Sequence, residues 1–150
     1  MTDAKIPEGF EPLATESPFN LNVGPLYCRR TDHEFVFGIL VEEKHCNRSG
    51  NLHGAMVGAI ADIALGHNVG LVLAEQGVFD GVTSSGAPGA PIATVNMNTD
   101  YAGTASVGDW VEVRVDVQRT GRTLAFANAY LHSGAERIAR TSAIFRVMIG

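Results

Sequence analysis

The chain has 150 residues, of which 45% are hydrophobic and 18% charged, and its net charge at pH 7 is −5. This size and composition fit one globular domain and exclude a disordered chain. The acidic balance disfavours a general affinity for nucleic acid or anionic membrane, because neither offers an opposite charge to an acidic surface. We therefore expect no nucleic-acid or membrane partner.

The cysteines and histidines give no sign of a metal site. The two cysteines, Cys28 and Cys46, form neither a C-x-x-C pair nor a disulfide framework, and the five histidines lack metal-ligand spacing. The N-terminus lacks the basic start and apolar run of a signal peptide. We expect a cytoplasmic protein without a bound metal.

The first elements in chain order are an arm and a hairpin. Residues 1–24 are polar and irregular, which predicts an N-terminal arm or a short helical cap against a domain of residues 25–150. The runs "PLYCRR" and "FVFGILVEE" follow, separated by a polar turn at residues 31–34. Both are rich in the β-branched and aromatic residues typical of strands, and they predict a β-hairpin.

One long helix comes next. The segment from about His53 to Glu75 is alanine-rich, apolar and almost free of turn signals, which predicts a helix. Only Asp62, His67 and Asn68 are polar in its interior, so nearly the whole circumference is apolar. Such a helix should be wrapped by other structure.

Four strand-like stretches complete the chain after a loop rich in Gly, Ser and Pro. They span about 91–101, 109–119, 122–132 and 136–148. Without a repeating βαβ unit, this order predicts an α+β fold in which a curved antiparallel sheet wraps one central helix. A single sheet has open edges that a second copy commonly covers, so we expect at least a homodimer.

Asp62 is a lone acid on an apolar helix. It requires a partner, because burying an unpaired carboxylate costs several kcal/mol. One interpretation is structural, with a backbone amide or an arginine as the partner. The other is chemical: a general base or a nucleophile in a pocket that water or an acyl group can enter.

The start of the helix offers a second candidate group. The segment "NLHGA" places Gly54 in the first turn, where amide N–H groups lack partners and the dipole is positive, so an oxyanion would be stabilised there. Asn47 and His53 flank this turn and could orient a carbonyl or a water, although a loop cap or a satisfied histidine gives the same pattern. Cys46 and His45 are adjacent, point to opposite faces of an extended segment and cannot share a proton.

Four features together carry a resemblance to a known family: "HCNRSGNLHGA", the acid at Asp62, "TVNMNTDYAGTASVGDWVEV" and "GRTLAFANAYL". Over about residues 35–148 the chain resembles the hot-dog fold acyl-CoA thioesterases of the phenylacetic-acid-pathway (PaaI-like) type. The most specific part is the N-x-x-G-x-x-H-G motif from Asn47 to Gly54. The resemblance implies hydrolysis of a coenzyme A thioester, with coenzyme A as part of the substrate and no separate cofactor.

The resemblance also implies roles for five residues. Asp62 would be the catalytic carboxylate, as base or nucleophile, and Gly54 would supply the oxyanion amide. Asn47 and His53 would position the thioester carbonyl or a water, and Thr94 would lie beside the acid. The segment 76–91 is longer than in close members of the family and is a candidate for shaping the acyl pocket.

The spacing of the two main groups predicts an intersubunit site. Eight residues at a rise of about 1.5 Å put Gly54 and Asp62 about 12 Å apart along the helix, too far for both to touch one thioester carbon. If both act, the acid of one subunit faces the helix start of its partner. We therefore expect a homodimer, with further pairing into a tetramer.

Three arginines are candidates for the nucleotide phosphates of coenzyme A. Arg119 and Arg122 flank the glycine of a predicted turn, and Arg48 lies in the motif loop. Guanidinium groups suit phosphate because they offer paired donors. A solvated turn would give the same pattern.

Two other functions fit the predicted fold. A hot-dog hydratase or dehydratase uses a different arrangement of histidine and acid, which the motif loop and the mid-helix acid disfavour. A non-catalytic acyl-CoA-binding module would be expected to carry a DNA-binding or effector segment, and the sequence shows no basic helix-turn-helix pattern.

Overall fold

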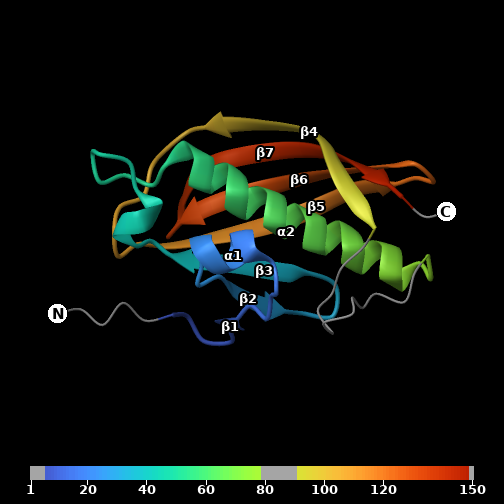
Figure 1. Ribbon diagram of the computed structural model, residues 1–150, viewed down its shortest axis with the longest axis horizontal. Helices are drawn as coiled ribbons and strands as arrows, with labels where there is room; N and C mark the ends of the chain where they lie inside the picture. Colours follow the sequence, from blue (N-terminus) through green and yellow to red (C-terminus); the bar gives the residue numbers. More distant parts are fainter. Residues whose placement is uncertain (1–5, 79–90, 149–150) are drawn as a thin grey trace.

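A curved antiparallel sheet packed on one long helix forms the body of the molecule (Figure 1). The computed structural model describes residues 6–78 and 91–148. The helix is α2 (Gly54–Glu75), and the sheet has seven strands in the spatial order β1-β2-β3-β5-β6-β7-β4. The strands are β1 (Glu11–Pro12), β2 (Tyr27–Arg30), β3 (Phe35–Leu40), β4 (Ile92–Tyr101), β5 (Trp110–Thr120), β6 (Leu124–Ser133) and β7 (Glu136–Val147). The predicted hot-dog architecture is confirmed.

The predicted elements agree closely with the observed ones. α2 begins at Gly54 with His53 as its N-cap, and the four later strands lie where the sequence predicts them. The hairpin of β2 and β3 is also confirmed. The short helix α1 (Pro18–Val23) lies in the segment expected to form an arm or a short helical cap, whereas a 3-10 turn, η1 (Glu43–His45), and strand β1 were not predicted. The division of the chain at residue 24 stays a prediction.

Small side chains let the helix approach the middle of the sheet. Three buried positions of β6 that face α2 are alanines, Ala125, Ala127 and Ala129. Ile60 and Leu65 of α2, the helix that packs on β6, are fully buried. A close-packed interior accepts large residues on one layer when the facing layer is small.

In residues 6–78 and 91–148, the sheet does not enclose α2 completely. By length and composition α2 could cross a membrane, but 61% of its apolar stretch is buried inside the protein, as in a core helix. Four small residues of α2 are exposed or partly exposed, Ala55, Gly58, Ala59 and Gly66, and of these Gly58 and Gly66 lie nearest to side chains of β4. Within the described ranges, part of the surface of α2 thus stays uncovered.

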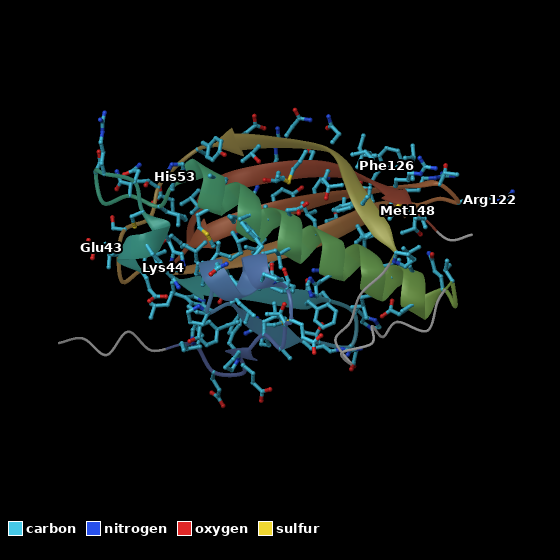
Figure 2. The ribbon with its side chains drawn as sticks, viewed as in Figure 1. Glu43, Lys44, His53, Arg122, Phe126 and Met148 are labelled. Carbon is cyan, nitrogen blue, oxygen red and sulfur yellow. The ribbon has the colours of Figure 1, made fainter. Side chains whose placement is uncertain are left out.

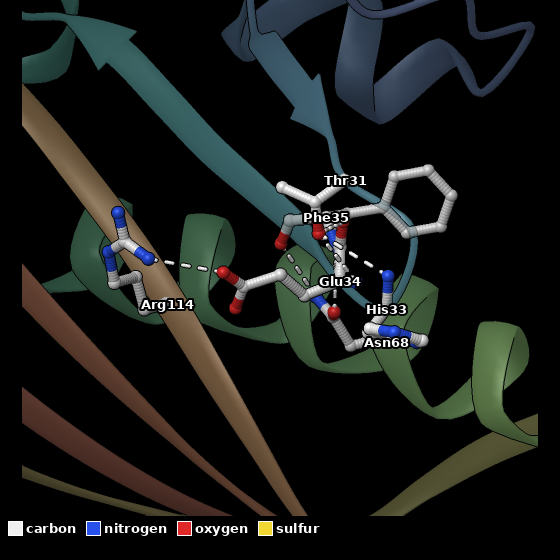
Figure 3. A network of polar contacts seen from close by, with 6 residues as sticks. All are labelled: Thr31, His33, Glu34, Phe35, Asn68 and Arg114. Atoms are coloured by element: carbon white, nitrogen blue, oxygen red, sulfur yellow. Dashed lines mark hydrogen bonds and ion pairs between the residues drawn. The ribbon is translucent and has the colours of Figure 1, made fainter.

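Asn68 fastens α2 to the start of β3 (Figure 3). Its side chain accepts a hydrogen bond from the N–H of Phe35 and donates one to the carbonyl of Phe35, both at 3.0 Å. It also donates to the carbonyl of Ala64 at 2.9 Å. Asn68 is only 3% exposed, and these bonds explain how the helix tolerates a buried amide.

An aromatic cluster covers the outer face of the first strands. Trp110 lies 5.0 Å from the ring of Phe10 and 5.7 Å from that of Tyr27, measured between ring centroids. Its indole also crosses Gly38, where an added Cβ would lie 2.1 Å from the ring. Glycine is therefore required at position 38, and Phe10 ties the N-terminal segment to the sheet.

Strand β4 forms one edge of the sheet. Among the described strands it pairs with β7 alone, and Val95, Met97 and Tyr101 on it are exposed, with Val95 at 55% and Tyr101 at 58%. Long open edges with apolar side chains favour pairing with another chain.

Candidate active site

Asp62 lies in an open hollow between α2 and β4. Its Oδ1 accepts a hydrogen bond of 2.7 Å from the hydroxyl of Thr94, which places Thr94 beside the acid as the resemblance implies. The hollow has a volume of about 820 Å³. Its walls are Gly54, Ala55, Gly58, Ala59, Asp62 and Ile63 of α2, Thr94, Met97, Thr99 and Tyr101 of β4, and Ser17, Phe19 and Asn20.

The partners of Asp62 bear on its role. Across residues 6–78 and 91–148, neither an arginine nor a backbone amide bonds to its carboxylate, and its one hydrogen bond comes from Thr94. The structural interpretation required one of those two partners. A half-buried carboxylate held by a neutral hydroxyl at the wall of a hollow is instead accessible to a water or a substrate.

The start of α2 leaves one amide free. The carbonyl of His53 accepts from the amides of Met56 and Val57, and its Nδ1 accepts from Ala55 at 2.9 Å. Within the described part of the chain, the N–H of Gly54 has no acceptor. Gly54 lines the hollow of Asp62, and its amide, the first of α2, is a candidate donor to an oxyanion.

His53 acts as a helix cap in this structure. Because Nδ1 accepts the amide of Ala55, the ring proton lies on Nε2. The imidazole is exposed and lines a second, smaller hollow rather than that of Asp62. His53 thus prepares the helix start and keeps one N–H donor for a ligand or partner.

Tyr101 is a site residue that the sequence analysis missed. Its hydroxyl donates to the carbonyl of Gly54 at 2.9 Å, and its ring would lie 3.3 Å from a Cβ at position 54. A glycine at the helix start therefore allows Tyr101 to pack against the first turn. The two residues are 47 positions apart in the chain, so no local pattern indicates this contact.

Asn47 organises the motif loop. Its Oδ1 accepts from the amides of Ser49 at 2.9 Å and Asn51 at 3.2 Å. Gly50, at the tip of the loop, has φ of +79°, which favours glycine. Asn47 does not line the hollow of Asp62 within one chain, and Arg48 is exposed in the same loop.

Arg119 and Arg122 lie far from the helix start. Figure 2 shows Arg122 at one end of the molecule and His53 at the other. The hydrogen bond from Thr120 to Gln76 places this turn at the C-terminal end of α2. Within one chain these arginines are not part of the hollow.

His67, another polar residue of α2, does not line the hollow of Asp62. His67 packs against Phe35 and Phe37, and its Nδ1 lies 2.8 Å from the carbonyl of Ile63. Burial lowers the pKa of His67 below the ordinary 6.5.

In the described ranges, no group of three or more His, Cys, Asp and Glu residues could hold a metal ion. Most of the segment 76–91, expected to shape the acyl pocket, lies outside the described residues.

Comparisons with known proteins agree with this fold. Residues 49–140 match the thioesterase superfamily. A Pseudomonas aeruginosa protein whose name proposes an esterase is 36% identical over 143 residues, covering 95% of this chain and 97% of that protein. Acyl-coenzyme A thioesterase 13 of Mus musculus is 31% identical over 91 residues, covering 61% of this chain and 55% of that protein.

Solved structures show the same architecture. The zebrafish thioesterase superfamily member 2 is 28% identical, with a TM-score of 0.69 over 90% of this chain and 89% of that one. The PaaI protein of the E. coli phenylacetic acid degradation operon shares the fold at 14% identity, with a TM-score of 0.72 over 90% of this chain and 87% of that one. The chain belongs to the thioesterase superfamily, as the resemblance of its motifs indicates.

Proposed function

We propose that the protein hydrolyses a thioester of coenzyme A to a free acid and coenzyme A. The observation that carries the proposal is the carboxylate of Asp62, held by Thr94 at the wall of an open hollow that also reaches Gly54. Membership of the superfamily and the thioesterase name of the mouse relative support the class of substrate.

The residues suggest how the reaction proceeds. The thioester carbonyl oxygen would accept a hydrogen bond from the amide of Gly54, which stabilises the charge of the tetrahedral intermediate. Asp62 would take a proton from the attacking water, or would attack the carbonyl carbon itself before water releases the acid. In both routes a C–O bond forms, the C–S bond breaks and the thiolate of coenzyme A is protonated.

The site would be shared between two subunits. Gly54 and Asp62 stand about 12 Å apart along one helix, by the rise of about 1.5 Å per residue. The open edge of β4, with exposed Val95 and Tyr101, would pair with a second copy, which would bring another helix start to Asp62. Asn47 and His53 of that helix start would then position the carbonyl or the water. Dimers would pair further into tetramers.

Binding of the nucleotide part would involve the arginines. Arg48 precedes the start of α2 by a few residues and could bind phosphate beside the helix start of its own chain. Arg119 and Arg122 could take part only where another copy brings them to the site. A cytoplasmic location, without nucleic-acid or membrane partners, belongs to the same proposal.

A thiol-release assay with purified protein tests the activity. With short, long and aromatic acyl-CoA thioesters as substrates, Asp62→Asn should lower kcat by at least about 100-fold, the scale of losing a general base. Thr94→Val should be milder, because the hydroxyl only orients the carboxylate. Asp116→Asn makes the same chemical change at an exposed position of β5 and should retain full activity.

Two results would contradict the proposal in different ways. Activity of Asp62→Asn within a few-fold of wild type would remove Asp62 from the chemistry. Tight binding of acyl-CoA by the wild type without release of thiol would instead identify a non-catalytic acyl-CoA-binding module.

A further inference from the structure

Phe19 of α1 lies between two hollows beside the start of α2. The larger is the hollow of Asp62, of about 820 Å³. The smaller, of about 300 Å³, has a mainly apolar wall that includes Val23, Cys46 and Met56. Phe19 lines both hollows, together with Ala55 and Ala59, which lie one turn apart on α2.

α1 is held in place over the helix start. The carbonyl of Val23, the last residue of α1, is bonded to Nε2 of the buried His45, whose Nδ1 accepts from the amide of Glu42. The carbonyl of His45 in turn accepts from the amide of His53, the cap of α2. This chain of bonds fixes α1 relative to Gly54, and Figure 1 shows α1 beside the first half of α2.

Phe19 is nevertheless 55% exposed. Its neighbours on α2 are alanines, which leave room beside the ring and cannot cover it. An apolar chain lying in the larger hollow would bury the ring and gain about 25 cal/mol per Å² of covered apolar surface. The ligand that suits these walls is an aliphatic or aromatic acyl group.

We infer that Phe19 limits the length of the acyl chain by separating the hollow of Asp62 from the smaller apolar hollow beside Met56. The inference rests on the proposed thioesterase activity and assigns the acyl end of the substrate to the α1 side of the site. Shortening the side chain would join the two hollows and admit a longer chain. Enlarging it would restrict the site further.

The experiment compares chain-length preference in variants of α1. Thiol release is measured with acetyl-, hexanoyl- and dodecanoyl-CoA, and kcat/KM is determined for each substrate. Phe19→Ala should raise the ratio of dodecanoyl to hexanoyl kcat/KM at least about tenfold, the effect of a methylene or more in an apolar pocket. Phe19→Trp should lower the ratio, and Phe19→Leu should fall between Phe19→Ala and wild type.

Leu21→Ala is the matched control. Leu21 lies on the same helix, is 64% exposed and lines neither hollow, so its loss should leave the preference unchanged. Melting temperatures verify that each variant folds, and Phe19→Leu gives a conservative change should Phe19→Ala be unstable.

The outcomes test the proposed function and the role of Phe19 separately. A wild-type protein that releases no thiol from any of the three substrates would overturn the proposed function, and this inference with it. If the wild type is active and Phe19→Ala, Phe19→Leu and Leu21→Ala all keep its chain-length preference, the inference alone is overturned. A uniform change of kcat/KM on all substrates would do the same, because it would mean that Phe19 does not contact the end of the acyl chain.

Discussion

Replacing Gly54 with proline removes one backbone amide from the start of α2 and leaves the helix otherwise complete. The N–H of Gly54 has no acceptor in the described ranges, and proline suits the first position of a helix because its φ is already helical. The residue before a proline must be extended, and His53 is, with φ −66° and ψ 136°. The substitution therefore breaks no hydrogen bond of the fold.

Two effects of this substitution can be separated. Any side chain at position 54 adds a carbon 3.3 Å from the ring of Tyr101, which is a tight contact. Gly54→Ala adds the same Cβ and keeps the amide, so it measures the contact of this carbon with Tyr101 alone. Loss of one oxyanion donor costs about 2.7–4 kcal/mol, or about 10²–10³ in kcat. We expect kcat of Gly54→Pro to lie at least about 100-fold below that of Gly54→Ala.

Thiol release and thermal melting together decide the outcome. The two variants should melt at similar temperatures while their kcat values differ. Equal kcat in the two variants, both folded, would refute the assignment of the Gly54 amide to the oxyanion.

Three further predictions address assembly, packing and pH. Mixing Asp62→Asn with Gly54→Pro under conditions that exchange subunits should restore about one quarter of wild-type sites, because about half the dimers are mixed and each mixed dimer has one intact site of two. Mixed dimers without recovered activity would place both groups in a site within one chain. Asn68→Ala should lower the free energy of unfolding by about 1–3 kcal/mol in a urea titration, since Phe35 loses its buried partners; an unchanged midpoint would contradict this. Burial lowers the pKa of His67 in the folded protein. As the pH falls below 6.5, His67 is therefore protonated in the unfolded chain before it is protonated in the folded protein, and the free energy of unfolding should fall. His67→Phe should reduce this fall.

Most of the fold could be predicted because its signals are local. α2 is one continuous apolar segment between a capping histidine and Glu75. The later strands are segments of alternating apolar and polar residues, or of β-branched residues, between polar turns. Strand β1 escaped prediction because it has only two residues and is defined by its pairing with β2.

The site was only partly predictable. Asp62 was identified because an acid interrupts an apolar pattern, Gly54 because it lies in the first turn of the predicted helix, and Thr94 because the chain resembles a family. Tyr101 and Phe19 meet residues that are far away in sequence: Tyr101 bonds to Gly54, and Phe19 lines two hollows together with Ala55. An aromatic residue in a polar arm was the one local signal for Phe19.

The buried amide of Asn68 determines which way Asp62 points. Beside the contacts of its large apolar residues with the sheet, α2 has a polar contact that fixes its rotation about its axis. Asn68 makes two hydrogen bonds to Phe35 of β3, and single buried polar residues fix the register of coiled coils in the same way. Asn68 follows Asp62 by about 9 Å of helix, and a rotation of one residue, about 100°, would turn the carboxylate away from Thr94. Asn68, which does not line the hollow, thus sets the direction in which the carboxylate of Asp62 points.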